Sequence, residues 1–204
     1  MVNIIHMTAD GEHTRVRILG EARDLYLETG LVHFSLREVA RRVGVSAPAV
    51  YRHYDNKEAL LRAVCTEGFR VFSDYLLAAL GAKSPRERLA RAAEQYLRFG
   101  LEHPHDYRFI FMSSPVDVRA IASGPRTPAL APTFQFLVDR VRECMQAHVL
   151  RRSDPEEIAT QIWAHVHGLV SLRVSGHLAR LGDDAAFSRF YHNAVEKLLT
   201  GLAP

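Results

Sequence analysis

The chain has 204 residues, of which 48% are hydrophobic, so it can bury a sizeable core and is not a disordered tail. Its formal net charge is only +3, and this small excess of basic residues does not by itself indicate a nucleic-acid partner. No apolar run reaches the ~18–20 residues that a transmembrane helix needs, so the sequence predicts no membrane span.

The ends and the cysteines indicate the compartment. Residues 1–12 have neither the apolar stretch nor the cleavage site of a signal peptide, so we expect them to form a flexible leader. Cys65 and Cys144 both lie among apolar residues, as small core side chains do in a reducing compartment. We therefore expect a cytoplasmic protein without disulfides.

Apolar residues recur at three- and four-residue spacing along nearly the whole chain, and strict alternation persists nowhere. This pattern predicts an all-α protein. The first helices are expected at about 14–29, 36–43 and 47–54, followed by a longer one at about 57–80. The remaining helices are expected at about 85–103, 106–112, from 128 onward, 154–181 and 184–202.

Residues 35–57 carry the pattern of a helix-turn-helix. Ala40 is small enough for a second helix to cross close to it. Gly44 can take the left-handed conformation that turns the chain sharply, and Ser46 is placed to cap the helix that follows. A hairpin with solvated arginines would not need this combination. The pattern predicts that the helix at 47–54 lies in the major groove of DNA.

The side chains expected to contact DNA lie on and around that second helix. Small residues at its start allow close approach to the groove floor, where thymine methyl groups make apolar contacts. Polar and basic groups further along can donate hydrogen bonds to phosphates, and Arg37 and Arg52 can also reach a base edge. The predicted DNA-binding residues are Ser35, Arg37, Ser46, Ala47, Pro48, Ala49, Tyr51, Arg52, His53, Tyr54 and Lys57.

Residues 14–60 resemble the DNA-binding domain of the TetR family of regulators. The resemblance implies a homodimer that binds double-stranded operator DNA, with repression relieved when a small-molecule effector binds a helical C-terminal domain. Ala47 and Ala49 replace polar or glycine residues often found there, which leaves few side chains for base readout. The matching pieces are Ser35-Leu36-Arg37-Glu38-Val39-Ala40, Gly44-Val45-Ser46, Val50-Tyr51-Arg52-His53-Tyr54 and Asn56-Lys57-Glu58-Ala59-Leu60-Leu61.

The C-terminal part resembles a TetR subgroup whose sensor domain carries a Trp…His-Gly signature. The matching pieces are Tyr96-Leu97-Arg98-Phe99-Gly100-Leu101-Glu102-His103-Pro104, Tyr107-Arg108-Phe109-Ile110-Phe111, and Trp163 with His167-Gly168. Trp163 and His167 are four residues apart and share a helix face, so they could supply an apolar wall and a polar handle for a small-molecule pocket. Both could equally be core residues, and so could the aromatic candidates. The predicted ligand-binding residues are Phe99, His103, Phe109, Met112, Phe134, Trp163 and His167.

The expected domains are a helix-turn-helix domain at 13–60 and a ligand-sensing and dimerisation domain at 61–204. The helix at 154–181 is apolar on most sides, so either its own domain or a second subunit buries it. Together with the helix at 184–202, it is expected to build the homodimer interface as a four-helix bundle.

No metal, cofactor or catalytic site is expected. His165 and His167 point to opposite sides of a helix, and His103 and His105 have no acidic residue at ligand spacing. No glycine-rich phosphate loop or nucleophile elbow is present. The sequence favours a ligand-responsive repressor. The alternatives are an activator or ligand-independent DNA-binding protein on the same scaffold, and a helical enzyme or adaptor with a vestigial N-terminal hairpin.

Overall fold

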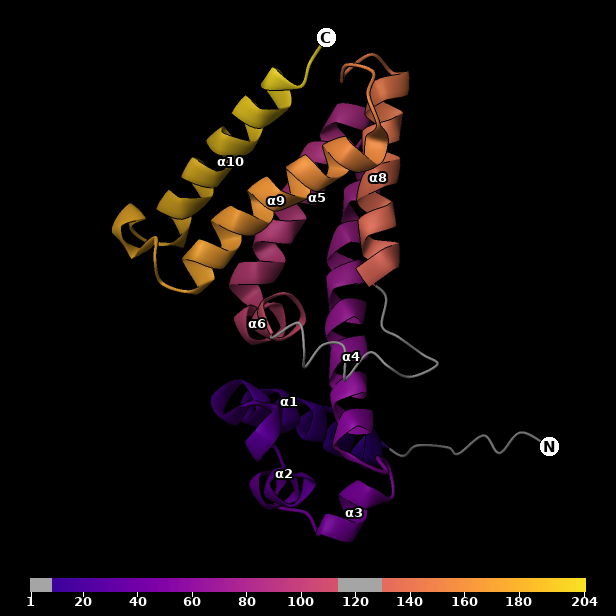
Figure 1. The fold of residues 1–204 in the computed structure, drawn as a ribbon, viewed down its shortest axis with the longest axis vertical. Coiled ribbons are helices and arrows are strands. Elements are labelled where there is room, and N and C mark those ends of the chain that lie inside the picture. Colours follow the sequence, from indigo (N-terminus) through magenta and orange to yellow (C-terminus); the bar gives the residue numbers. More distant parts are fainter. Residues whose placement is uncertain (1–8, 114–129) are drawn as a thin grey trace, which may run out of the picture. The chain divides into compact units, whose positions relative to one another are not determined.

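The computed structural model describes residues 9–113 and 130–204, and within these ranges every regular element is a helix (Figure 1). The prediction of an all-α protein is confirmed. The chain divides into two compact units, and the boundary between them falls inside helix α4, between Glu67 and Gly68. The sequence-based boundary near residue 60 lies one to two helical turns earlier. Unit 1 below means residues 9–67, and unit 2 means 68–112 together with 130–204.

Unit 1 contains α1 (Ala9–His33), α2 (Leu36–Val43), α3 (Ala47–Tyr51) and the first part of α4 (Lys57–Leu77). α1 packs on α2, and α2 packs on α3. The apolar faces predicted from three- and four-residue spacing meet in one interior. Its buried side chains are Ile18, Leu19, Ala22, Leu25, Tyr26, Phe34, Leu36, Val39, Ala40, Val43, Val50, Tyr54, Leu60, Leu61 and Val64.

Two helices of unit 1 differ in length from the prediction. α1 begins at Ala9, so residues 9–12 of the expected leader are helical, while residues 1–8 lie outside the described residues. α3 ends at Tyr51 instead of 54, because the backbone N–H groups of His53 and Tyr54 both donate to the carbonyl of Val50 and close a turn. Arg52 and His53 therefore extend from a turn and not from the helix.

Unit 2 is organised around α5 (Pro85–Glu102), which packs against α6, α8, α9 and α10. Its largest fully buried side chains come from three of these helices and are Tyr107, Tyr191, Phe99 and Phe187. No described helix is both long enough and apolar enough to cross a membrane. The other elements are η1 (Ala78–Gly81), α6 (Pro104–Met112), α8 (Leu130–Gln146), α9 (Pro155–Val174), η2 (Ala179–Leu181) and α10 (Asp184–Gly201).

The starts of three helices in unit 2 follow the signals in the sequence. Ser84 and Glu87 form a reciprocal capping box at α5. Asp154 accepts the N–H of Glu156 at α9, and Asp183 accepts an N–H at the start of α10. α9, however, ends at Val174, and the residues after it form a turn and the short η2 instead of continuing the helix to 181.

Candidate functional site

The turn between α2 and α3 has the geometry that a helix-turn-helix requires. Gly44 lies in the left-handed region, with φ 77° and ψ 30°. Its N–H and that of Val45 both donate to the carbonyl of Ala40, each at 3.0 Å. Val50 is fully buried and anchors α3 to the interior. The opposite face of α3 is consequently left at the surface of unit 1.

Most of the predicted DNA-binding side chains reach that surface. Ser35, Ala47, Ala49 and Lys57 are half-buried. Their placement leaves α3 with a narrow contact face made of small residues and one aromatic ring. The exposed members of the predicted set are Arg37, Ser46, Pro48, Tyr51, Arg52 and His53.

Tyr54 is the exception, because its side chain is buried in the interior of unit 1. Burial raises the pKa of its hydroxyl, against the opposing influence of a hydrogen bond with Arg15 of α1. The backbone turn at the end of α3 directs this ring inward. Tyr54 therefore supports the turn and presents no surface to a nucleic acid, which corrects its assignment from sequence.

The ammonium group of Lys57 is already engaged within unit 1. Its Nζ donates to the backbone carbonyl of Leu31 at 3.2 Å. Gly30, with φ 69° and ψ 175°, breaks the regular helix just before that carbonyl, so the lysine satisfies an acceptor that the break leaves without a helical partner.

Two of the arginines on α2 are neutralised by carboxylates. Glu38 lies 2.6 Å from Arg41 and 3.3 Å from Arg42, and Arg42 also binds Glu28 at 2.6 Å. Glu38 accepts a hydrogen bond from Arg41 and a second from Arg42, and these bonds lower the pKa of Glu38 to about 2. The three- and four-residue spacing of these groups was a signal for this network.

The remaining cations of this surface are uncompensated. Within the part of the chain that the structure describes, Arg37 and Arg52 form no ion pair, and both are exposed. Arg37 lies in the first turn of α2, and Arg52 follows the last residue of α3. The two positive charges thus lie at the two ends of the helix pair, where they can attract phosphate.

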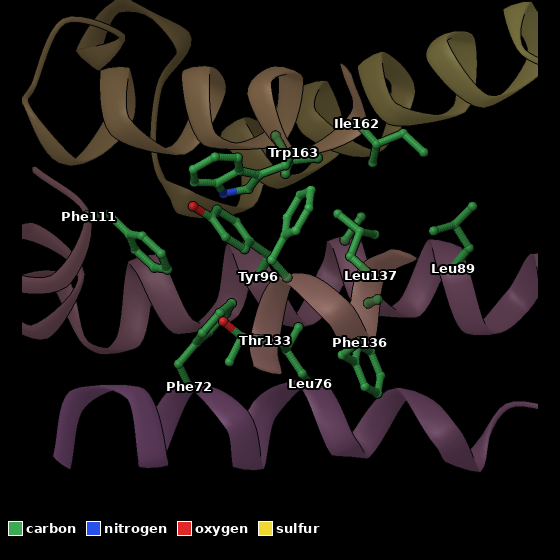
Figure 2. A pocket seen from close by; sticks show the side chains of 14 residues that line it. Phe72, Leu76, Leu89, Tyr96, Phe111, Thr133, Phe136, Leu137, Ile162 and Trp163 are labelled. Carbon is green, nitrogen blue, oxygen red and sulfur yellow. The ribbon is translucent and has the colours of Figure 1, made fainter. Parts of the chain in front are cut away.

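Unit 2 encloses a cavity of about 40 Å³ between α4, α5, α6, α8 and α9 (Figure 2). This space holds a few water molecules and is smaller than a drug-sized ligand requires. A larger molecule can enter only if the lining helices separate. The cavity is lined by Phe72, Leu76, Leu89, Ala92, Ala93, Tyr96, Phe111, Thr133, Phe134, Phe136, Leu137, Ile162, Trp163 and Val166.

Of the predicted ligand-binding residues, Phe134 and Trp163 line this cavity, with ring centroids 6.0 Å apart in an edge-to-face arrangement. Phe99 and Phe109 are buried elsewhere in the core, and Met112 is exposed. Phe109 points away because it is two residues from Phe111, and residues two apart on α6 face different sides.

His103 also lies outside the cavity. Its Nε2 is 3.1 Å from the hydroxyl of Tyr75, and its Nδ1 faces the carboxylate of Asp106 at 3.5 Å. The polar partners of this histidine come from α4 and α6, at the end of α5, instead of from a bound molecule.

Several lining residues, notably Tyr96 and Phe111, are absent from the predicted ligand-binding set. The spacing of residues on α5 could have identified Tyr96. Leu89, Ala92, Ala93 and Tyr96 follow one another at spacings of three, one and three, which is one face of a helix, and all four line the cavity. The same helix face continues to Phe99, and the sequence indicated that residue as the ligand-binding candidate.

His167 lies beside the cavity and not in its wall. Its Nδ1 is 2.8 Å from the hydroxyl of Tyr107 and 3.0 Å from the hydroxyl of Tyr96, and the Tyr107 ring stacks on the imidazole. Burial lowers the pKa of His167 and raises the pKa of both tyrosines. The imidazole is therefore neutral and fixes the hydroxyl groups of α5 and α6 against α9.

Within residues 9–113 and 130–204, no three His, Cys, Asp or Glu side chains are arranged to hold a metal ion. The candidate sites considered below are the cavity just described, which brings two of the predicted ligand-binding residues together, and the surface of α2 and α3.

Comparison with known proteins links both sites to one class. Residues 18–64 match the family model for bacterial regulatory proteins of the tetR family, and residues 89–198 match the model for the tetracyclin repressor-like C-terminal domain. The transcriptional regulator UidR of Escherichia coli is 24% identical over 149 residues, which are 69% of this chain and 71% of that protein.

Two further proteins are similar to this chain, one over a third of its length and one over all of it. The class D tetracycline repressor of Escherichia coli is 36% identical over 67 residues, 33% of this chain and 31% of that protein. A solved structure of a protein of unknown function from Rhodococcus sp. RHA1 covers 100% of both chains, with a TM-score of 0.75 and 25% identity. The fold of the whole chain therefore has a solved counterpart.

Proposed function

The chain belongs to the TetR family of bacterial transcriptional regulators, and we propose that it is a repressor that binds a near-palindromic operator as a homodimer and is released by a small-molecule effector. The observation that carries the proposal is the surface of unit 1, where α3 has an exposed face and Arg37, in the first turn of α2, and Arg52, directly after α3, are exposed and uncompensated. Operator DNA lies in the bacterial cytoplasm, where the protein would act.

On the operator, each subunit places α3 in the major groove, and the two grooves lie about one helical turn, ~10 base pairs, apart. Ala47, Pro48 and Ala49 bring the backbone close to the groove floor. Tyr51 and His53 donate to phosphates on one side, and Ser35, Ser46 and Lys57 reach them on the other. Arg37 and Arg52 supply the charge and any direct reading of a base edge. With so few polar side chains on α3, DNA shape would contribute much of the specificity.

The effector would enter the cavity of unit 2 and separate its lining helices. Phe111 of α6 and Phe72 of α4 both line it, so a molecule there acts on both helices. At Gly68 the two helices are so close that a Cβ atom would lie 2.9 Å from Cγ2 of Ile110. A shift of α6 would therefore displace α4, which continues into unit 1 and carries Lys57 at its start.

The homodimer would form through α9 and α10. Leu172 and Phe190 are each 43% exposed in the single chain, although both are large apolar side chains. Two copies of this helix pair would cover these residues in a four-helix bundle and set the separation of the two α3 helices.

The test is binding of the purified protein to DNA from upstream of its own gene, measured by fluorescence polarisation at moderate salt. We expect one fragment to bind roughly a thousandfold more tightly than random DNA, as a dimer by sedimentation. Transcription from that promoter in vitro should fall when the protein is added, whereas a rise would identify an activator. Failure to prefer any upstream fragment would refute the proposal.

Variants of two neighbouring arginines make the test specific. Arg37→Ala should cost about 1–3 kcal/mol on the operator and relax the preference at particular base pairs. Arg41→Ala is the matched control, because the guanidinium of Arg41 is already held by Glu38. Equal losses for Arg37→Ala on operator and random DNA would show that Arg37 positions the protein without reading bases.

A further inference from the structure

The wall of the unit 2 cavity combines aromatic rings with two hydroxyl-bearing side chains, Tyr96 and Thr133 (Figure 2). We propose that the effector is an uncharged, mainly apolar ring compound carrying one hydrogen-bond acceptor, and that the hydroxyl of Tyr96 donates to that acceptor. The inference rests on the proposed function, since it names the ligand class of the same cavity, but it makes its own claim about chemistry.

The lining excludes a charged ligand. Among the described residues that line the cavity, none carries a charge, and only Tyr96 and Thr133 carry a hydroxyl group. Arg140 lies over the ring of the lining residue Phe136 at 4.8 Å but does not line the cavity itself, and it binds Glu143 at 2.8 Å, a carboxylate that Arg88 also binds at 3.1 Å. A carboxylate in the cavity would therefore have no cationic partner among the described lining residues, and an unpaired buried charge is strongly unfavourable.

The hydrogen bonds of Tyr96 leave its proton available. A neutral imidazole with its proton on Nε2 has one acceptor lone pair, on Nδ1, so only one of Tyr96 and Tyr107 can donate to Nδ1 at one time, while Tyr107 also has the backbone carbonyl of His167 as an acceptor at 3.3 Å. Tyr107 makes the shorter contact, 2.8 Å against 3.0 Å. When Tyr107 donates to Nδ1, the only other acceptor recorded for Tyr96 is the Tyr107 hydroxyl at 3.4 Å, which is a weak hydrogen bond.

The indole of Trp163, on α9, is the next neighbour of the Tyr96 hydroxyl, and Figure 2 shows the indole nitrogen beside the phenol oxygen. Burial raises the pKa of Tyr96, and the influence of Trp163 opposes this rise. The Tyr96 oxygen can accept from the indole N–H and still has one proton to give. A carbonyl, ether or hydroxyl oxygen in the cavity would be a better acceptor than the distant Tyr107. This arrangement selects a ligand with an acceptor over an isostere without one.

The shape of the site selects rings. Phe72, Phe111, Phe134 and Trp163 present faces and edges to the same space. The cavity volume of about 40 Å³ is well below the ~150 Å³ of a cavity known to hold benzene, so even one ring requires some widening. Phe134, Phe136 and Leu137 of α8 are only half-buried, as are Phe111 of α6 and Trp163 of α9, so these parts of the wall can yield more easily than the fully buried residues of α4 and α5.

Three probes of nearly equal shape test the proposal, namely acetophenone, isopropylbenzene and benzoate. Trp163 is the only tryptophan of the chain and lines the cavity, so its fluorescence reports occupancy directly in the full-length protein. Thermal shift provides a second readout. We expect acetophenone to bind about 5- to 10-fold more tightly than isopropylbenzene, which corresponds to one net hydrogen bond. Benzoate should bind at least about 100-fold more weakly than acetophenone.

The Tyr96→Phe variant should keep its affinity for isopropylbenzene and lose the preference for acetophenone. Tyr191→Phe is the matched control, because Tyr191 is equally buried but donates to the backbone carbonyl of Ala93 at 2.8 Å and does not line the cavity. This control should retain the preference. A Tyr96→Phe protein that still prefers acetophenone would show that Tyr96 does not read the ligand.

Three other outcomes overturn the inference: benzoate binding as tightly as acetophenone, equal binding of acetophenone and isopropylbenzene to the wild type, or no saturable signal with any probe. Because no DNA is present, these results are separate from the proposed function. A protein that shows the expected probe selectivity but binds no operator contradicts repression alone. A protein that binds its operator but prefers benzoate contradicts only the ligand class.

Discussion

The hydroxyl of Tyr107 lies 2.8 Å from Nδ1 of His167, so a buried polar contact joins α6 to α9 inside unit 2. The two rings also stack, with centroids 5.8 Å apart and planes at 25°. Burial of the imidazole lowers its pKa below the usual value of 6.5. The contact therefore depends on a histidine that stays neutral when the protein is folded.

We expect the stability of the protein to fall as the pH drops below about 6.5. In that range the unfolded histidine binds a proton, whereas the folded one does not until the pH reaches its lower pKa. His167→Asn keeps an acceptor near Nδ1 and cannot titrate, so its free energy of unfolding should decline less steeply, by under ~1.4 kcal/mol per pH unit.

Urea unfolding between pH 7.5 and 5.5 measures this slope. His13→Asn serves as the control, since His13 is exposed on α1, and it should follow the wild type. A His167→Asn profile parallel to that of the wild type would contradict the prediction.

Two neighbouring tyrosines should differ in their effect on DNA binding. Tyr51 is exposed on α3, and loss of its hydroxyl in Tyr51→Phe should cost about 1 kcal/mol per subunit, roughly 5-fold in affinity. Tyr54 is buried, so Tyr54→Phe should leave operator affinity unchanged. Fluorescence polarisation with one operator fragment compares the two variants. A larger loss for Tyr54→Phe, in a protein of unaltered stability, would place that residue on the DNA after all.

Lys57 must exchange its carbonyl partner for a phosphate if it contacts DNA. Lys57→Met keeps the aliphatic stem and removes the charge. The slope of log affinity against log salt concentration should then decrease by about 0.9 per subunit, with base preference unchanged. Lys83→Met, at an exposed lysine in unit 2, is the control. An unaltered salt slope would mean that Lys57 stays on the carbonyl of Leu31 in the complex.

α5 and α9 pack closely at Gly100. A Cβ atom there would lie 2.3 Å from Cγ1 of Val170, so Gly100→Ala forces the two helices apart. Overpacking of this kind should destabilise the protein by about 1–3 kcal/mol. Gly20→Ala, in α1 with nothing within 4 Å of the new atom, should be neutral or stabilise by up to about 1 kcal/mol. Thermal unfolding of both variants measures the two effects. Equal melting temperatures for Gly100→Ala and Gly20→Ala would contradict the close packing at Gly100.

Much of the local structure could be predicted because its causes are local. The left-handed turn at Gly44 and the caps at Ser84, Asp154 and Asp183 depend on residues within a few positions of one another. The helix ends that were predicted wrongly depend on packing against other helices as well. α3 ends at Tyr51, and the turn that follows directs the ring of Tyr54 into an interior built by other helices.

The candidate sites were harder to predict for the same reason. Periodicity identifies the face of a helix that is buried but not the neighbour that it meets. The stripe on α5 therefore indicated Phe99 as readily as Tyr96, although only Tyr96 lines the cavity. On α2, Glu38 lies at helical spacing from Arg41 and Arg42, but no local pattern places Glu28 of α1 beside Arg42.

By itself, the sequence determined the helices, the turn of the helix-turn-helix and the family, since each depends on interactions within a few residues or on a contiguous motif. Only the tertiary structure decided that Tyr54 is buried, that Arg37 and Arg52 are the uncompensated cations, and that Tyr96 and Tyr107 meet His167. Tyr96 and Tyr107 are 60 or more residues from His167 in the sequence. Contacts over such distances form only when separate helix faces pack together, and no local spacing encodes that packing.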